Sequence, residues 1–325
     1  MPTRPVGSEA WVMPELSSAH ALAAAQHGVI SREQAAGCGL SVHQIQRLVR
    51  TGRWRRVRVG VYLVRGDPAP ALAARVMAAQ LVYGPRAVAV GGTAARLWRM
   101  QGPLPGPGHE FIHLCAPGVA GAKHEGLRLH GWRVGPDEVT LCGGIRLTTP
   151  GRTVRDTVLM TDRYSGISVI DSALQQGLVN AEDLPVPEAA NAGRQGARRT
   201  RSWWSLADGR AQSTFETRLR LVCHDAGIPP ETLQYPVHDG EGGLVGHADL
   251  AWPGWGVVAE ADGSAPHALP DALFTDRRRQ NRILSAPERL VLLRFTWRDL
   301  QRPDDIVAMI LEARDQRAAM AGAAR

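Results

Sequence analysis

The N-terminal part of the sequence most restricts the possible folds, because it combines capped helices with a basic strand. Ser31 and Ser41 each precede a short helix-prone run, and Gln44 follows Ser41 at the spacing of a capping box. Residues 54–63 then alternate basic or small side chains with apolar ones, which is typical of a strand. Helix, short helix, helix and basic strand in this order predict a winged helix-turn-helix over residues 18–66.

The charge of this segment is one-sided, since residues 41–65 hold seven arginines and no acidic residue. The whole chain has 38 Lys and Arg against 31 Asp and Glu, and this basic balance favours a polyanionic partner. A helix start rich in Gln and His can reach base edges, while arginines on a wing neutralise phosphates. We therefore expect double-stranded DNA as a partner; a solvated basic face on a protein-docking module is the alternative. The predicted DNA-binding residues are His43, Gln44, Arg47, Arg50, Arg55, Arg56 and Arg58.

The same segment resembles a known family. The run from Gly28 to Ala35, with Leu48, Gly52 and the closing Gly60-Val61-Tyr62, is similar to the N-terminal domain of AbiEi-family antitoxins. That family supplies the antitoxin of type IV toxin–antitoxin systems, and its winged helix represses its own promoter. The resemblance implies a winged-helix fold, a role in transcription regulation and a cognate toxin as a second partner.

The central part of the chain, residues 67–183, predicts a mixed α+β domain with no pairing of a nucleophile and a base. Arg152 and Asp156 stand at helical i, i+4 spacing and predict a surface ion pair. Residues 184–210 are rich in Pro, Gly and Arg and predict a linker. Four histidines are interpreted as exposed loop residues rather than metal ligands: His109, His113, His124 and His130.

Residues 211–325 predict a helix, three strands and a hairpin loop at 253–256. If Trp252 pairs with Val257 across this loop, counting back places Asp249 opposite Glu260, with His247 opposite Asp262. Side chains that face each other in this way have Cβ atoms about 4.5–5.5 Å apart. Two opposed carboxylates repel unless a cation lies between them, and Mg²⁺ prefers oxygen ligands. Asp249 and Glu260 are therefore the predicted magnesium ligands, and the metal would support phosphodiester hydrolysis. The alternative is that these acids form salt bridges, with Arg277 or Arg218 as partners.

The C-terminal segment also resembles a domain of unknown function related to very-short-patch-repair (Vsr-like) endonucleases of the PD-(D/E)xK type. The resemblance rests on the order of elements and on Asp249, Glu260-Ala-Asp262-Gly263 and His267. It departs from the nuclease motif because Asp262 occupies the lysine position, and Lys123 is the only lysine of the chain. The catalytic residues that the resemblance implies are Glu216, Asp249, Glu260, Asp262 and His267. The alternative interpretation of Glu216 is a structural role, in a capping box with Ser213.

Together these patterns predict an α/β chain, α+β overall. Its parts are an N-terminal winged helix-turn-helix (18–66), a mixed middle domain (67–183), a linker (184–210) and a restriction-endonuclease-like α/β domain (211–325). The expected function is that of a DNA-binding regulator of antitoxin type with an endonuclease-like domain appended. The alternatives are a Mg²⁺-dependent DNA endonuclease targeted by its winged helix, and a module that docks a toxin.

The expected location is cytoplasmic. The four cysteines have no C-x-x-C spacing, and no signal peptide or membrane-spanning stretch is apparent. We expect no membrane partner, and the sequence leaves the oligomeric state open.

Overall fold

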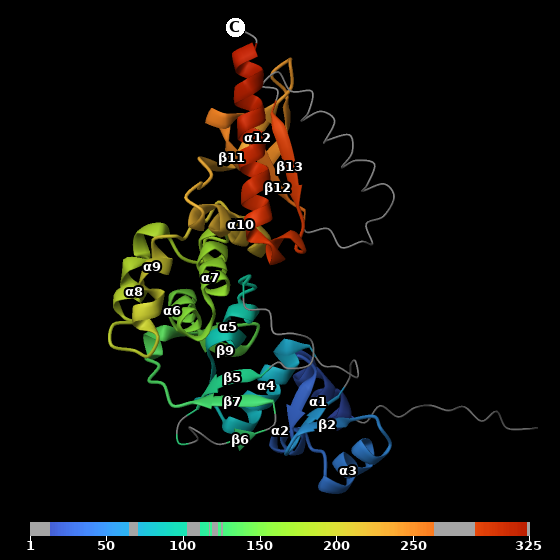
Figure 1. The fold of residues 1–325 in the computed structure, drawn as a ribbon. Coiled ribbons are helices and arrows are strands. Elements are labelled where there is room, and N and C mark those ends of the chain that lie inside the picture. The colour runs from blue at the N-terminus through green and yellow to red at the C-terminus, as the bar shows by residue number, and fades with distance from the viewer. Residues whose placement is uncertain are drawn as a thin grey trace, which may run out of the picture. The chain divides into compact units, whose positions relative to one another are not determined.

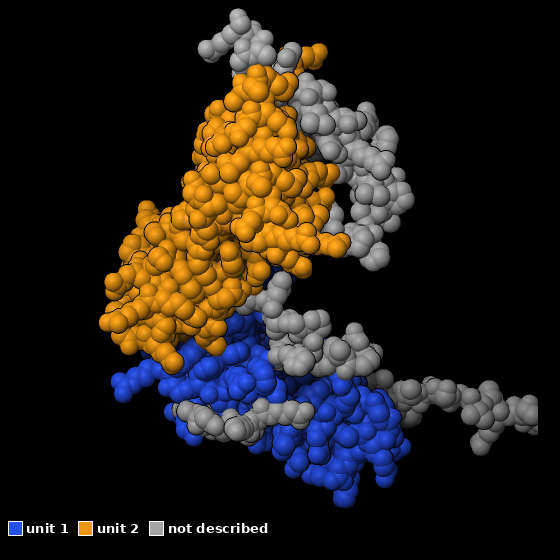
Figure 2. Space-filling view, in the orientation of Figure 1, with its two compact units in different colours: residues 1–99, 105–153 blue, residues 100–104, 154–325 orange. Residues whose placement is uncertain are grey.

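The structure is a computed structural model in which residues 14–64, 71–102, 111–116, 118, 123–124, 126–262 and 290–323 are described (Figure 1). The chain forms two compact units (Figure 2). Unit 1 comprises residues 1–99 and 105–153, and unit 2 comprises residues 100–104 and 154–325. The described helices and mixed sheets confirm the predicted α+β class.

The N-terminal part of unit 1 is a winged helix-turn-helix, as predicted. Its three strands form a sheet of order β1-β3-β2, in which β3 is antiparallel to both neighbours. A hydrophobic core that includes Trp54, Ile30, Ile45 and Leu48 packs beneath the helices. The elements are α1 (Pro14–Ala25), β1 (Val29–Ser31), α2 (Arg32–Gly37), α3 (Val42–Arg50), β2 (Arg55–Arg58) and β3 (Val61–Leu63).

Both short helices begin where their capping residues predict. The Ser31 hydroxyl accepts a hydrogen bond from the Gln34 backbone N–H at 3.1 Å, and the Ser41 hydroxyl accepts one from Gln44 at 3.3 Å. In return, the side-chain oxygen of each glutamine accepts a hydrogen bond from the backbone N–H of its serine. These reciprocal bonds satisfy amides that a helix start otherwise leaves without partners.

The rest of unit 1 is a six-stranded mixed sheet of order β6-β7-β5-β4-β9-β8. One hydrophobic core joins Val29, Val61 and Leu63 of the winged-helix sheet to α4 and to the six-stranded sheet. This core therefore crosses the predicted boundary between residues 66 and 67. The elements are α4 (Leu72–Tyr83), β4 (Val88–Ala89), α5 (Gly91–Leu97), β5 (Ile112–Cys115), β6 (Lys123–His124), β7 (Leu127–His130), η1 (Pro136–Glu138), β8 (Val139–Cys142) and β9 (Ile145–Thr148).

The first helices of unit 2 include the segment predicted as a linker. Residues 184–210 form two short helices, and Trp203 and Trp204 are buried. The Trp203 ring lies so close to Gly166 that a Cβ atom there would be 2.8 Å from the ring. The two buried tryptophans thus hold this segment against the rest of unit 2. The segment predicted as a linker is therefore a packed helical layer. The elements are α6 (Pro150–Met160), α7 (Arg163–Gln175), η2 (Ala181–Asp183), α8 (Pro185–Ala189) and α9 (Ala197–Trp204).

The remainder of unit 2 is a four-stranded sheet of order β10-β11-β12-β13, in which only the β12–β13 pairing is parallel. Phe215 and Leu219 of α10 pack with Leu250 and Trp252 of β11 and with Ile310 of α12. The elements are α10 (Thr214–Asp225), β10 (Thr232–His238), β11 (Leu244–Trp252), η3 (Pro253–Trp255), β12 (Val257–Ala261), β13 (Val291–Phe295), η4 (Asp299–Gln301) and α12 (Pro303–Ala323). No described helix is both long and apolar enough to cross a bilayer.

Candidate nucleic-acid interface and acidic residues

Helix α3 presents one polar, basic face to solvent. His43, Gln46, Arg47 and Arg50 are all exposed. Their i, i+3, i+4, i+7 spacing places them on one side of a helix. Ile45 and Leu48 are buried on the opposite side. The face thus holds three of the four residues predicted to contact DNA from this helix.

Gln44, the fourth predicted residue of this helix, has a local role. Its side-chain oxygen accepts the Ser41 backbone N–H at 2.7 Å, and the residue is half-buried. Contact between Gln44 and a base would therefore break a helix cap. Gln46, outside the predicted set, is the exposed glutamine of this helix, and its helical spacing with His43 and Arg50 was the signal for it.

The wing is a short hairpin whose turn contains Gly60 in the left-handed region at φ +70°. Arg55 and Arg56 of β2 are exposed, and Arg53 just before the strand is also exposed. Arg58 is half-buried beside Tyr83: burial raises the pKa of Tyr83, and the Arg58 charge partly offsets that rise. The solvent-facing arginines of the wing are therefore Arg53, Arg55 and Arg56.

The hairpin of unit 2 has the predicted register, since Trp252 pairs with Val257. The described ladder ends at Leu250 opposite Ala259. Beyond that pair, the Asp249 carboxylate accepts the Ala261 backbone N–H at 2.8 Å. This bond holds the carboxylate at the backbone of β12.

Glu216 and Asp249 meet around one amide. The Gln234 side chain donates to Glu216 Oε2 at 2.9 Å and to Asp249 Oδ1 at 3.3 Å. The Gln212 backbone N–H also donates to Glu216, at 2.8 Å. Burial raises the pKa of Glu216, hydrogen bonds partly offset the rise, and the charge of Asp249 adds to it. The predicted bond from the Glu216 backbone N–H to the Ser213 hydroxyl is also present, at 3.1 Å.

Glu260 and Asp262 share one arginine on the neighbouring strand. Arg294 stands opposite Glu260 in the parallel β12–β13 pairing. Its Nε lies 3.5 Å from Glu260 Oε2, and its Nη2 lies 3.2 Å from Asp262 Oδ2. Arg218 was one of two arginines expected to pair with Asp249 and Glu260, and its guanidinium lies over the rings of Tyr164 and Trp297. The other expected partner, Arg277, lies outside the described residues.

The four acids of the predicted catalytic set thus form two pairs, one around Gln234 and one around Arg294. Within the described ranges, no group of three or more His, Cys, Asp and Glu side chains could hold a metal ion. Mg²⁺ commonly takes one or two protein carboxylates and completes its shell with water and phosphate, so Glu216 and Asp249 have suitable donor chemistry. His247 is exposed, and His267 lies outside the described residues. The Mg²⁺ site at Asp249 and Glu260 stays a prediction.

Two expectations about the central residues are wrong. His113 and His130 are half-buried on β5 and β7, and their ring nitrogens lie 2.9 Å apart. Burial and the neighbouring His130 and Arg128 charges lower the pKa of His113 to about 4. Arg152 and Asp156 are both buried rather than on the surface, and Arg152 pairs with Glu138. The parallel pairing of β5 with β7 creates the histidine contact, and the approach of η1 to the start of α6 creates the pair of Arg152 with Glu138. Local spacing reveals neither contact.

Comparison with known proteins agrees with the winged-helix fold of the N-terminal part. Residues 20–65 match the family model described as transcriptional regulator, AbiEi antitoxin. Two proteins of Mycobacterium tuberculosis, uncharacterized protein MT2308 of strain CDC 1551 / Oshkosh and uncharacterized protein Rv2248 of strain H37Rv, are each 33% identical to the chain over 236 residues. The aligned region covers 73% of this chain and 83% of each relative. The chain belongs to the MT2308/Rv2248 family. In this family member, residues 20–65 form the AbiEi-type regulator domain. The resemblance of residues 211–325 to repair endonucleases stays a prediction.

Proposed function

We propose that this protein is a DNA-binding transcriptional regulator of antitoxin type, with α3 in the major groove and the wing against the phosphate backbone. The observation that supports the proposal is the exposed face of α3, which holds His43, Gln46, Arg47 and Arg50 and no acid. Winged helices bind DNA through such a helix, which a major groove can admit. A regulator of this kind acts in the cytoplasm, on the chromosome.

The residues of the interface fall into two groups, those placed to contact base edges and those placed to neutralise phosphates. His43 and Gln46 lie on the first two turns of α3, where a recognition helix contacts base edges. Arg47 and Arg50 lie in its last turn, and together with the wing arginines they carry the charge that neutralises phosphates. Affinity is expected to come mainly from these arginines and sequence preference mainly from His43 and Gln46.

Replacing both Arg47 and Arg50 with alanine is expected to weaken duplex binding about 10- to 100-fold at moderate salt, because two phosphate contacts are lost. The slope of log K against log salt should fall by about 2. The probes are a duplex from the region upstream of the protein's own coding sequence and an unrelated duplex of equal length, measured by fluorescence anisotropy.

The matched control is Arg298→Ala with Arg302→Ala, which removes two exposed arginines of unit 2, outside the winged helix. The control should keep the parent affinity. Equal losses in the two double variants would show that only overall charge matters, and the proposed interface would be rejected.

A second candidate function is that of a Mg²⁺-dependent DNA endonuclease. The adjacency of Glu216 and Asp249 around Gln234 favours it, since paired carboxylates suit a metal that assists phosphodiester hydrolysis. The chemistry that bound Mg²⁺ would supply is activation of water and stabilisation of developing charge. The two carboxylates and the amide between them would orient the metal.

If this candidate is correct, the parent protein should nick supercoiled plasmid with Mg²⁺ or Mn²⁺, and Asp249→Asn should reduce the rate at least about 100-fold because a metal ligand is lost. Asp304→Asn removes an exposed carboxylate on α12 and should leave the rate unchanged. Nicking that survives Asp249→Asn would assign the activity to a contaminant.

A cognate toxin is the protein partner that an antitoxin role implies. The observation in its favour is the match of residues 20–65 to the AbiEi antitoxin model. Co-purification with the product of a neighbouring gene would identify such a partner.

A further inference from the structure

We propose that helix α9 of unit 2 is a second DNA-binding surface of the chain, which contacts the phosphate backbone of a duplex. Arg198, Arg201 and Ser202 are exposed, and their i, i+3, i+4 spacing places them on one side of the helix. Trp203 and Trp204 of the same helix are buried. This surface lies outside the winged helix, and its contact with DNA does not depend on α3.

The segment that contains α9 is strongly basic. Residues 194–210 hold five arginines and one acid, Asp208. The Asp208 carboxylate is bound by Arg210, whose Nη2 and Nε donate to it at 2.7 Å and 3.0 Å. The acids that precede the segment lie on η2 and α8, and no described carboxylate is within ion-pair distance of Arg198 or Arg201. The charge of these two arginines is therefore available to a ligand.

Helix α9 is anchored to its neighbours, so its basic face is arranged before any ligand binds. It packs beside α7 (Figure 1), where the Trp203 ring lies over Gly166. Arg199 Nη2 donates at 3.0 Å to the carbonyls of Leu159 and Thr161 at the C-terminal end of α6. The Arg199 guanidinium also lies 5.2 Å from the centroid of the Trp203 ring. A surface whose backbone is fixed in advance loses little conformational entropy on binding.

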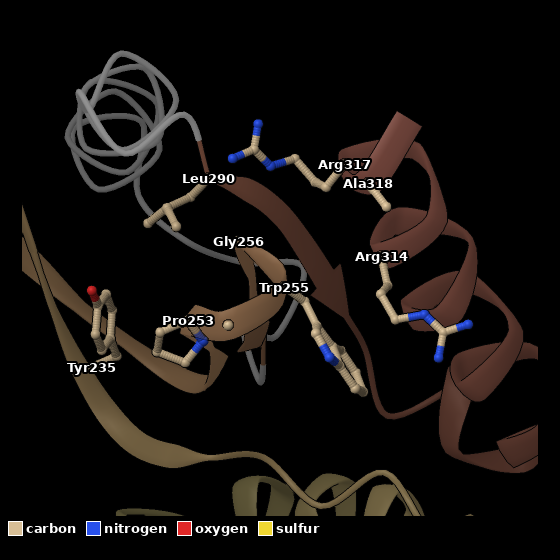
Figure 3. A pocket seen from close by; sticks show the side chains of 9 residues that line it. Tyr235, Pro253, Trp255, Gly256, Leu290, Arg314, Arg317 and Ala318 are labelled. Carbon is tan, nitrogen blue, oxygen red and sulfur yellow. The ribbon is translucent and has the colours of Figure 1, made fainter. Parts of the chain in front are cut away.

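The pocket beside α12 differs from α9 in this respect. Arg314 lines that pocket, which has a volume of about 420 Å³ and lies between the β11–β12 turn and α12 (Figure 3). Arg314 pairs with Asp315 at 2.8 Å, and its guanidinium lies 5.5 Å from the centroid of the Trp255 ring. Arg198 and Arg201 have neither an ion pair nor a hydrogen bond to a described group, so α9 is the better candidate for a polyanion.

The chemistry of the α9 face matches phosphate oxygens. Guanidinium groups and serine hydroxyls are both hydrogen-bond donors that proteins commonly place against the DNA backbone. The helix contains no acid that would repel phosphate. Arginines that neutralise phosphates release the counterions condensed on a duplex, which favours binding at low salt. Backbone contacts carry no sequence information, so the affinity that α9 adds is expected to be the same for any duplex.

The test measures the affinity of the full-length chain, at several salt concentrations, for an upstream duplex and an unrelated duplex of equal length. Arg198→Ala with Arg201→Ala is expected to weaken binding of both duplexes by the same factor, about 5- to 50-fold at moderate salt. The slope of log K against log salt should fall by about 2, because two phosphate contacts are lost. Arg198→Lys with Arg201→Lys keeps both charges and should keep the parent slope.

The matched control is Arg298→Ala with Arg302→Ala, which removes two exposed arginines of unit 2 outside α9 and should keep the parent affinity. An equal loss in this control would overturn the proposal, and so would a loss confined to one of the two duplexes. Unchanged affinity and slope in the alanine variant of α9 would also overturn it. In that case, loss of polyglutamate binding in the same variant would identify an acidic protein surface as the occupant.

Combination with the α3 variants separates this surface from the winged-helix interface. In a chain that already carries Arg47→Ala and Arg50→Ala, the α9 changes should lower the remaining affinity by the same factor as in the parent. The reason is that the two sets of residues belong to different units and share no described partner. A loss in the α9 variant alone would retain the α9 surface and reject the winged-helix interface. A loss in the α3 variant alone would do the reverse, and absence of duplex binding by the parent at low salt would overturn both.

Discussion

Replacing Arg220 with methionine is expected to lower the free energy of unfolding by about 3–5 kcal/mol at pH 7.5, because it leaves a buried carboxylate without its cation. Arg220 Nη2 lies 2.7 Å from Asp171 Oδ2, and its Nη1 donates to the Leu206 carbonyl at 2.7 Å. Asp171 is 1% exposed and also accepts from the Thr217 hydroxyl and the Asp208 backbone N–H. Methionine fills the volume of the arginine side chain but is neutral, and it makes neither the ion pair with Asp171 nor the hydrogen bond to the Leu206 carbonyl.

The deficit of this variant should depend on pH. Burial raises the pKa of Asp171 from 3.8 to about 6, and Arg220 partly offsets the rise. Because the folded pKa is the higher one, the stability from this group is fully present below about pH 3.8 and is lost as pH rises through about 6. Without Arg220 the pKa rises further, so the loss continues above pH 6. The deficit relative to the parent should therefore be smaller at pH 5 than at pH 7.5.

Urea unfolding followed by tryptophan fluorescence at the two pH values measures both effects. The control is Arg302→Met, since Arg302 is 81% exposed and makes only a 3.9 Å surface pair with Asp305. It should change stability by no more than about 0.5 kcal/mol. Equal deficits for Arg220→Met at both pH values would refute the expected role of Asp171.

Replacing Trp54 with alanine is expected to cost about 3–5 kcal/mol and to abolish duplex binding. Trp54 is 1% exposed, and its ring contacts those of His20 and Tyr62. Its backbone N–H donates to the Leu48 carbonyl at 3.0 Å, which connects the end of α3 to the start of the wing. Loss of the ring leaves a cavity at this junction, so α3 and the wing no longer keep the arrangement that a duplex requires.

Hydrogen exchange of the amides of residues 41–64 and duplex binding by anisotropy measure the outcome. Val59→Ala, at an 85% exposed position of the wing turn, is the control and should preserve both quantities. Parent-like exchange protection in Trp54→Ala would show that the junction does not depend on this ring.

The winged helix was predictable because its signals are local. Each serine–glutamine cap joins residues three positions apart, and the alternation of the wing is contained in one strand. The pairing of Trp252 with Val257 was predictable for the same reason, since a four-residue loop sets it. The helical layer at 184–210 was not, because its order depends on Trp203 packing over Gly166, a contact across thirty-seven positions.

The candidate acidic site was predictable only in part. The hairpin register is consistent with the predicted placement of Asp249 and Glu260, but the groups that bind them come from elsewhere. Gln234 reaches Asp249 from β10 at a backbone position with φ +52°, which no sequence pattern indicates. Arg294 reaches Glu260 from β13, which is distant in sequence and joined by parallel pairing.

The core shared by the winged-helix sheet, α4 and the six-stranded sheet limits how this chain can be engineered. Cutting the chain near residue 66 would expose Val29, Val61 and Leu63 and leave an apolar surface on the excised fragment. A chimera that borrows this winged-helix module must therefore carry everything up to about residue 153.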